Sequence, residues 1–413
     1  MPHMPANRKR PRLLGDGARY RLLHVVTHPI QYFAPLYRAL SARHDIDLHV
    51  VFASKMGLGQ LMDSGFGQPI AWDVPILEGF ESSFLPGAAA RPKTGALPQM
   101  LASFRRILGT DAYDAVWVHG YTPPSSIAAI AVALANRIPV LLRDDATLID
   151  PRPLHRRLAK RLVLPPLLRH ISFLYIGSAN RRYWQHYGIA DDRLYFAPYS
   201  VDNAFFRRQA AALPAKAALR RRFGLPDEAP VALLAGKLIG EKDPITFLSA
   251  IAHPTGSAFG GLLAGDGPLR RDVECYIESN SVAGVRVSGF LNQTEISQAY
   301  GCADVLVLPS IHERWGLVVN EAMNFGLPII VSDKVGSAED LVASDRNGYV
   351  FPSGNPRALA FSLGLLADES RRRAFGKKSL ELVSKWGVDS TAAGIADAVA
   401  QVVAKARAER SGV

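Results

Sequence analysis

The sequence lacks any long apolar run. Nowhere do about 18 apolar residues follow one another without interruption. A helix that spans a bilayer needs a run of about that length, so no transmembrane segment is expected. The N-terminal residues are basic, but they lack the apolar centre and the small-residue cleavage site of a secretory signal. We therefore expect residues 1–19 to form a flexible basic tail and the protein to be cytoplasmic.

Cysteine is scarce as well, since only Cys275 and Cys302 are present. They give neither a disulfide framework nor the spacing of a metal site, which is typical of a protein from a reducing compartment. Asp45 and Asp47 have the spacing of a metal-binding carboxylate pair, but they precede the apolar run 48–52 and are interpreted as a solvated turn. We expect neither a metal nor a cofactor.

Acidic residues are absent between Pro151 and Ala190, in a chain whose formal net charge is +11. Leucines and basic residues recur there at helical spacing, which predicts a basic amphipathic helix within residues 152–170. Its apolar face carries Leu154, Leu158 and Leu162, and its polar face carries Arg156, Arg157, Lys160 and Arg161.

Three interpretations of this helix remain open. Its leucines cover a sheet while its basic face is solvated, or it docks on a partner with negative charge, or it binds nucleic acid. The negatively charged partner would be the anionic inner face of the membrane or a charged acceptor. No nucleic-acid motif accompanies the helix, so nucleic acid is not expected as a partner.

A chain of 413 residues is too long for one ordinary core. Short apolar runs alternate with helical patterns in two blocks that share no repeated sequence, which predicts an α/β protein with two doubly wound, Rossmann-like domains facing across a cleft. We place the N-terminal domain at 20–205 and the C-terminal domain at 206–388. A last helix is expected within residues 389–413.

The most informative stretch of the chain runs from Pro309 to Asp340 and contains two glutamates eight positions apart, Glu313 and Glu321. The apolar run 317–319 follows Gly316, and the sequence Gly-Leu-Pro at 326–328 supplies a stop signal for the helix. This pattern predicts a short helix from Leu317 to Phe325, entered from a loop that carries Glu313.

The start of this helix is a candidate anion site. Gly316 has no Cβ, so the backbone there can approach a ligand closely. The free amides of Gly316, Leu317 and Val318 and the positive end of the helix dipole favour negative charge. Two carboxylates beside an anion site suit a ligand with phosphates and hydroxyls, such as a nucleotide sugar. The alternative is that both glutamates are solvated surface residues.

This stretch resembles the signature of glycosyltransferase family 4, E-x-W-G-L-V-x-x-E-A-x-x-x-G-x-P, and further similarity extends from about Leu22 to Trp386. The resemblance implies the GT-B fold, a final helix that crosses back to the N-terminal domain, and retention at the anomeric carbon. It implies transfer of a sugar from a nucleotide-diphosphate sugar to a hydroxyl of a glycan or lipid-linked acceptor. The expected setting is the biosynthesis of cell-surface polysaccharides or glycoconjugates.

The resemblance also implies roles for single residues. Glu313 would hold the hydroxyls of the donor sugar and Glu321 those of the ribose, while Lys237 and Lys242 would stabilise the diphosphate. Fixed cations aimed at a leaving group are a strong electrostatic aid to catalysis. The whole expected donor site is Gly236, Lys237, Lys242, Gly265, Phe290, Glu313, Gly316, Leu317, Val318 and Glu321.

On the N-terminal side, His119 ends the apolar run 113–119, and the resemblance implies that it contacts the donor sugar. With Glu313 and Lys242 it completes the expected catalytic set. His28, Gln31 and Tyr32 follow the first apolar run, at the edge where open α/β sheets bind ligands, and are candidates for the acceptor site. The segment 55–97 is rich in glycine and proline and is expected to be a loop near the acceptor.

Two other functions stay open from the sequence. One is a related GT-B protein that hydrolyses or epimerises nucleotide sugars instead of transferring the sugar. The more remote one is a basic protein that binds membranes or nucleic acid.

Overall fold

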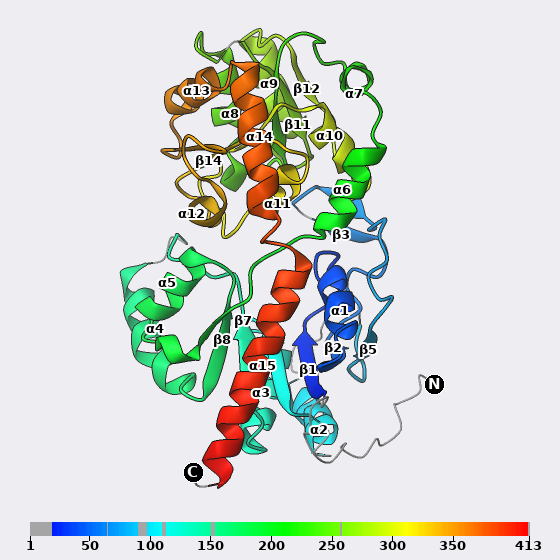
Figure 1. The fold of residues 1–413 in the computed structure, drawn as a ribbon, viewed down its shortest axis with the longest axis vertical. Helices are drawn as coiled ribbons and strands as arrows, with labels where there is room; N and C mark the ends of the chain where they lie inside the picture. Colours follow the sequence, from blue (N-terminus) through cyan, green and yellow to red (C-terminus); the bar gives the residue numbers. More distant parts are fainter. Residues whose placement is uncertain are drawn as a thin grey trace.

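The computed structural model describes residues 19–63, 65–89, 97–109, 113–149, 153–256 and 258–411, so most of the expected basic tail lies outside the described residues. Two domains are stacked along the long axis, the N-terminal one below and the C-terminal one above (Figure 1). Each is built on a parallel sheet with helices on both faces. The predicted pair of doubly wound α/β domains is confirmed.

The N-terminal sheet has seven strands in the order β5-β2-β1-β6-β7-β8-β9, and every neighbouring pair is parallel. Its strands are β1 (Tyr20–Val26), β2 (Ile46–Phe52), β5 (Glu81–Phe84), β6 (Ala115–His119), β7 (Val140–Arg143), β8 (Ile171–Tyr175) and β9 (Leu194–Phe196). One face packs on α2 (Leu97–Leu108), α3 (Pro124–Ala135), α4 (Leu154–Leu167) and α5 (Ser178–His186). The other face packs on α1 (Ala34–Ser41) and α15 (Val388–Ser411).

The C-terminal sheet has six parallel strands in the order β12-β11-β10-β13-β14-β15. Its strands are β10 (Val231–Ala235), β11 (Gly260–Ala264), β12 (Val285–Val287), β13 (Val305–Leu308), β14 (Ile329–Ser332) and β15 (Gly348–Phe351). The helices around it are α7 (Lys216–Phe223), α8 (Pro244–Ala252), α9 (Arg270–Ser279), α10 (Ile296–Cys302), α11 (Leu317–Met323), α12 (Ala338–Leu341), α13 (Pro356–Leu365) and α14 (Glu369–Val383).

The central strands are apolar throughout because helices cover both faces of each sheet. All five residues of β10 are buried, and its neighbours β11 and β13 are buried along their whole length. A parallel sheet brings the carboxyl ends of its strands to one edge. In both domains the loops at that edge carry the candidate site residues.

The chain passes between the domains twice. After β9 it continues into α6 (Asn203–Ala212), and at the other end α15 returns to pack on α1 and β9. In Figure 1 the red helix α15 lies along the lower domain. The Ser200 and Thr391 hydroxyls of the two passages are hydrogen-bonded at 2.6 Å. The last helix, expected within residues 389–413, begins at Val388 and ends at Ser411.

One local prediction needs correction, because the helix of the glutamate motif ends at Met323 instead of Phe325. The described part of segment 55–97 is largely loop, as predicted, but it also contains β5 and a separate antiparallel hairpin of β3 (Leu61–Asp63) and β4 (Gln68–Ile70). Within this segment, residues 64 and 90–96 lie outside the described residues.

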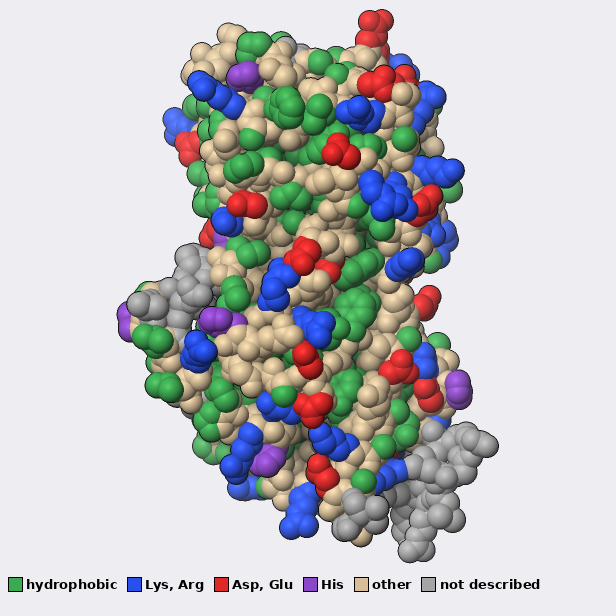
Figure 2. Space-filling model, turned by 60° about the vertical axis from the view of Figure 1, so that its left-hand side comes forward, with side chains coloured by type: hydrophobic (Ala, Val, Ile, Leu, Met, Phe, Trp, Pro, Cys, Tyr) green, Lys and Arg blue, Asp and Glu red, His purple; other side chains and the backbone are tan. Residues whose placement is uncertain are grey.

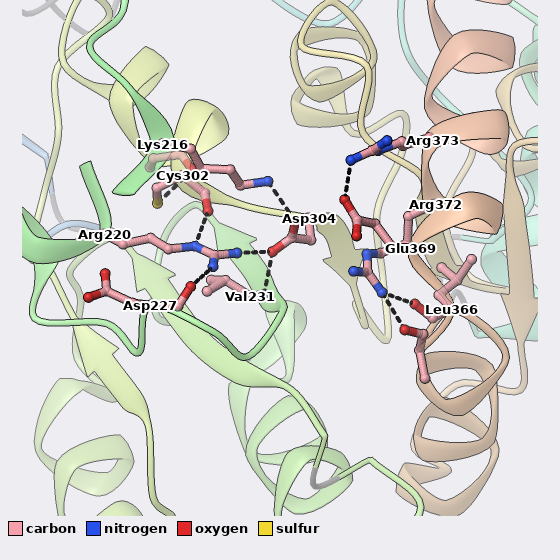
Figure 3. Close-up of polar contacts among 12 residues, drawn as sticks. Lys216, Arg220, Asp227, Val231, Cys302, Asp304, Leu366, Glu369, Arg372 and Arg373 are labelled. Carbon is pink, nitrogen blue, oxygen red and sulfur yellow. Dashed lines mark hydrogen bonds and ion pairs between the residues drawn. The ribbon is translucent and has the colours of Figure 1, made fainter. Parts of the chain in front are cut away.

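An ion pair ties α7 to the strand edge opposite the candidate site (Figure 3). Arg220 and Asp304 are paired through their side chains, which are 9% and 13% exposed. The Asp304 carboxylate also accepts hydrogen bonds from the Val231 amide at 2.7 Å and from Lys216 Nζ at 2.6 Å. One carboxylate thus joins the entry helix of the domain to the starts of β10 and β13.

Candidate functional site

The loop between β13 and α11 brings Glu313 to the edge that faces the N-terminal domain. Its backbone is fixed by a bond from the Glu313 amide to the Lys334 carbonyl at 3.0 Å and by a bond from the Gly336 amide to the Glu313 carbonyl at 2.9 Å. The loop ends at Gly316, whose φ is +89°. A Cβ there would lie 2.8 Å from a Leu308 methyl group, so glycine is needed for both backbone conformation and space.

Lys242 is paired with Glu313 in this structure. Lys242 ends the short 3-10 helix η2 (Gly240–Lys242) after β10, and its ammonium group donates to the Glu313 carboxylate. Both side chains are largely buried, with 18% and 16% exposure. Two expected catalytic residues from neighbouring strand ends therefore meet.

Lys237 lies in the loop that follows β10, and a residue of the other domain pairs with it. Its Nζ donates to both carboxylate oxygens of Asp63, at 2.9 and 3.0 Å. Gly236 and Gly265 explain how the ends of β10 and β11 come so close, since a Cβ on Gly265 would lie 1.8 Å from the Gly236 carbonyl oxygen.

Glu321 is almost completely buried on α11, with 3% exposure. Its carboxylate accepts hydrogen bonds from the hydroxyls of Tyr300, at 2.5 Å, and of Tyr32. Burial raises the pKa of Glu321 to about 7, and the two hydroxyls oppose that rise. Tyr32 comes from the N-terminal domain, so this expected acceptor residue instead reaches a residue expected to bind the donor.

Phe290, one of the residues of the expected donor site, is half-buried after β12. Its ring makes an edge-to-face contact with Phe66, with centroids 4.8 Å apart. Phe66 belongs to the turn between β3 and β4. The hairpin predicted as acceptor loop therefore lies against the candidate donor residues.

His119 ends β6 on the N-terminal side, and its ring packs on Phe33 with centroids 4.9 Å apart. Burial, reinforced by the nearby Arg143 cation, lowers the pKa of His119 to about 3. The imidazole is therefore neutral at physiological pH. Burial also lowers the pKa of the neighbouring His28, while Gln31 is buried with 6% exposure.

Polar contacts close to this site join the two domains. Arg314, between Glu313 and the helix, pairs with Asp145 of the N-terminal domain at 3.1 Å. The Ser178 hydroxyl donates to Asp340 at 2.7 Å. Sequence patterns did not single out these partners, because each contact joins residues that are more than 150 positions apart.

The basic helix α4 differs from the prediction in how its side chains are placed. Lys160 does not lie on a solvated face, since it contacts the rings of Tyr121, Tyr183 and Tyr187. Leu158 and Leu162 do not cover the sheet, because they are 55% and 77% exposed. The side chains of Leu154, Arg156 and Arg157 lie outside the described residues.

Neither a metal centre nor a membrane span is found in the part of the chain that the structure describes. No group of three or more His, Cys, Asp or Glu side chains there is arranged to hold a metal ion. Among the same residues, no helix is long and apolar enough to cross a bilayer.

The region that contains the candidate donor residues of the C-terminal domain is similar in sequence to known glycosyltransferases. A family model described as "Glycosyl transferases group 1" matches residues 215–381. D-inositol 3-phosphate glycosyltransferase of Xylanimonas cellulosilytica is 32% identical over 222 residues, which cover 52% of this chain and 53% of that protein. The match thus spans about half the length of this curated relative.

Two solved structures resemble nearly the whole chain. Sucrose-phosphate synthase of Thermosynechococcus elongatus has a TM-score of 0.70 at 18% identity, over 94% of this chain and 100% of that one. Anabaena HepE in complex with UDP and glucose has a TM-score of 0.68 at 17% identity, over 92% and 100%. At such identities they establish the fold, which is GT-B. Glu313 and Glu321 both lie inside residues 215–381, the region that matches the glycosyl transferases group 1 family.

Proposed function

We propose that the protein transfers a sugar, with retention, from a nucleotide-diphosphate sugar to a hydroxyl of a glycan or lipid-linked acceptor. The observation that carries the proposal is the meeting of Lys242 and Glu313, with Lys237 on the same loop as Lys242. All three lie within the residues matched by the family model. The curated relative named above is itself called a glycosyltransferase, and HepE was solved with UDP and glucose.

The chemistry assigns a role to each group. Breaking the bond between sugar and diphosphate leaves negative charge on the leaving phosphate, and preorganised ammonium groups stabilise that charge most when water is excluded. Lys237 and Lys242 supply these cations without a metal. Glu313 exchanges its bond from Lys242 for hydroxyls of the donor sugar, and Glu321 accepts from the ribose. The neutral His119 offers the sugar a hydrogen bond but no positive charge.

The proposal includes a place of action, the cytoplasm, and a setting, the synthesis of cell-surface polysaccharide or glycoconjugate. Nucleotide-diphosphate sugars are highly charged and do not cross a bilayer unaided. The enzyme therefore has to meet them in the compartment where they are made.

The first experiment is a thermal-shift panel of UDP-, GDP-, ADP- and dTDP-sugars, followed by a product assay with the best binder. We expect nucleotide sugars of one base to raise the melting temperature of the protein. In the product assay we expect little free sugar to be released when no acceptor is present. Equal release of free sugar with and without acceptor would favour the hydrolase alternative. The absence of any shift across the panel would contradict the proposed function.

We further propose that α4 places the enzyme on an anionic membrane surface. The exposure of Leu158 and Leu162, next to basic residues such as Arg161, supports this interpretation over a cover for the sheet. Leu167 is likewise 62% exposed at the end of the helix. Figure 2 shows hydrophobic and basic side chains together on this side of the molecule. Apolar side chains beside cations suit the interface of an anionic bilayer.

The variant Arg161→Glu/Leu162→Ser tests this membrane contact. Each basic residue near an anionic surface contributes about 1 kcal/mol, so reversing one charge and removing one leucine should weaken binding at least about tenfold. Binding is measured by sedimentation with phosphatidylglycerol vesicles, and neutral phosphatidylcholine vesicles should bind little of either protein. Arg221→Glu, an equal charge change on α7, should bind like wild type. Unchanged sedimentation of the double variant would refute the contact.

A further inference from the structure

The β3–β4 hairpin of the N-terminal domain lies against the C-terminal domain. In Figure 1, β3 is drawn above the sheet of its own domain, at the level of α6 and α11. Two polar contacts attach the base of the hairpin, since Asn292 donates to the Ala71 carbonyl at 2.8 Å and the Thr294 amide donates to Asp73 at 3.1 Å. The tip of the hairpin therefore reaches the loops that carry the candidate donor residues.

Asp63 at the end of β3 makes the main polar contact of the tip. Its carboxylate accepts from Lys237, and the amides of Gly65 and Phe66 fix its orientation at 2.8 and 3.1 Å. Burial raises the pKa of Asp63, but the hydrogen bond and charge of Lys237, together with the hydrogen bonds from the Gly65 and Phe66 amides, lower it further than burial raises it. An ionised carboxylate thus sits where Lys237 would meet a phosphate.

Two more side chains of the N-terminal domain touch the donor residues in the same way. The Phe66 ring covers the edge of Phe290, and the Tyr32 hydroxyl donates to Glu321. The hairpin backbone is also close, because a Cβ on Gly267 would lie 2.8 Å from the Gly65 carbonyl oxygen. A carboxylate, a ring and a hydroxyl of the N-terminal domain therefore contact three residues of the expected donor site, Lys237, Phe290 and Glu321.

We infer that Asp63 is a determinant of donor affinity: in the donor-free enzyme it holds Lys237 in place of the donor's diphosphate, and the β3–β4 hairpin has to withdraw before the donor binds. This inference rests on the proposed function. Phe66 and Tyr32 leave Phe290 and Glu321 in the same movement. The donor is admitted because a diphosphate brings more negative charge to Lys237 than one carboxylate does.

The ion pair between Lys237 and Asp63 is weak enough for the donor's diphosphate to replace Asp63. The side chains of Lys237 and Asp63 are 35% and 28% exposed, and an ion pair that water reaches is weak, with an effect on binding of no more than about fivefold. A contact of this size competes measurably with a ligand but does not exclude it. A deeply buried pair would instead block the site.

The test is the affinity of Asp63→Asn for nucleoside diphosphates. Removing up to about 1 kcal/mol of competition should lower the dissociation constant about two- to fivefold. Titration calorimetry with UDP, GDP, ADP and dTDP gives this value for the best binder. Asp47→Asn is the matched control, since Asp47 pairs with Arg21 in the N-terminal sheet at 3.1 Å, and it should bind like wild type.

A second variant shows whether the gain acts through Lys237. In a Lys237→Ala background, Asp63→Asn should give no further gain, as expected for two residues that act through one contact. This inference would be overturned if Asp63→Asn bound the nucleotide no more tightly than wild type. If Lys237→Ala still bound it more weakly than wild type, the proposed function would stand. If no variant and no wild-type protein binds any of the four nucleotides, both fail.

Discussion

Replacing Lys242 by alanine is expected to lower the turnover of sugar transfer about 10²- to 10³-fold. Loss of one preorganised group that stabilises charge in a transition state has an effect of that size. Lys242 is well placed for such a role, because its ammonium group is held by Glu313 and is largely shielded from water. Donor-dependent product formation at saturating donor measures the effect.

The control for this experiment is Lys378→Ala. Lys378 forms an ion pair with Glu381 on α14 at 2.8 Å and belongs to no part of the candidate site. Its variant should retain the wild-type turnover. If Lys242→Ala also stays within about threefold of wild type, Lys242 does not act on the leaving group.

Replacing Arg220 by alanine is expected to destabilise the C-terminal domain by about 3 kcal/mol, because breaking a buried ion pair is costly and the cation that remains beside Asp304, Lys216, is 43% exposed. Arg220 is 8% exposed, and its guanidinium also donates to the Asp227 carbonyl at 2.5 Å. Its loss therefore leaves Asp304 short of its nearest cation. Urea unfolding followed by tryptophan fluorescence measures the change.

Figure 3 also contains the matched control for this prediction, the exposed pair of Arg373 and Glu369. These side chains are 78% and 65% exposed. Arg373→Ala should cost less than about 1 kcal/mol, as is usual for ion pairs at the surface. Equal effects of Arg220→Ala and Arg373→Ala would show that burial of the Asp304 contact does not stabilise the domain.

Local sequence patterns predicted much of the fold and the C-terminal part of the site. Apolar runs such as 231–235 are strands because helices cover them on both faces, and that requirement is visible in the residues themselves. Gly316 marked the helix start because its backbone conformation, φ +89°, favours glycine. The resemblance to glycosyltransferase family 4 placed Lys242 and Glu313 in one site, and in the structure they meet after the carboxyl ends of two neighbouring parallel strands.

Contacts between the two domains could not be predicted in this way. Asp63 and Lys237 are 174 positions apart, and nothing in the Gly-rich surroundings of Asp63 distinguishes it from a solvated turn residue. Lys160 was placed on the polar face of its helix by spacing alone. The three tyrosines that surround it come from other segments, and a cation over aromatic rings is stabilised although it leaves the solvent.

The most direct test of the central claim is the binding of a nucleoside diphosphate to the variant Lys237→Ala/Lys242→Ala. Hydrogen bonds to charged groups contribute about 1.5–3 kcal/mol each, so the dissociation constant measured by calorimetry should rise at least about 100-fold. Circular dichroism should show the variant folded like wild type. An unchanged dissociation constant would mean that the diphosphate is bound elsewhere, and would contradict the account of this site.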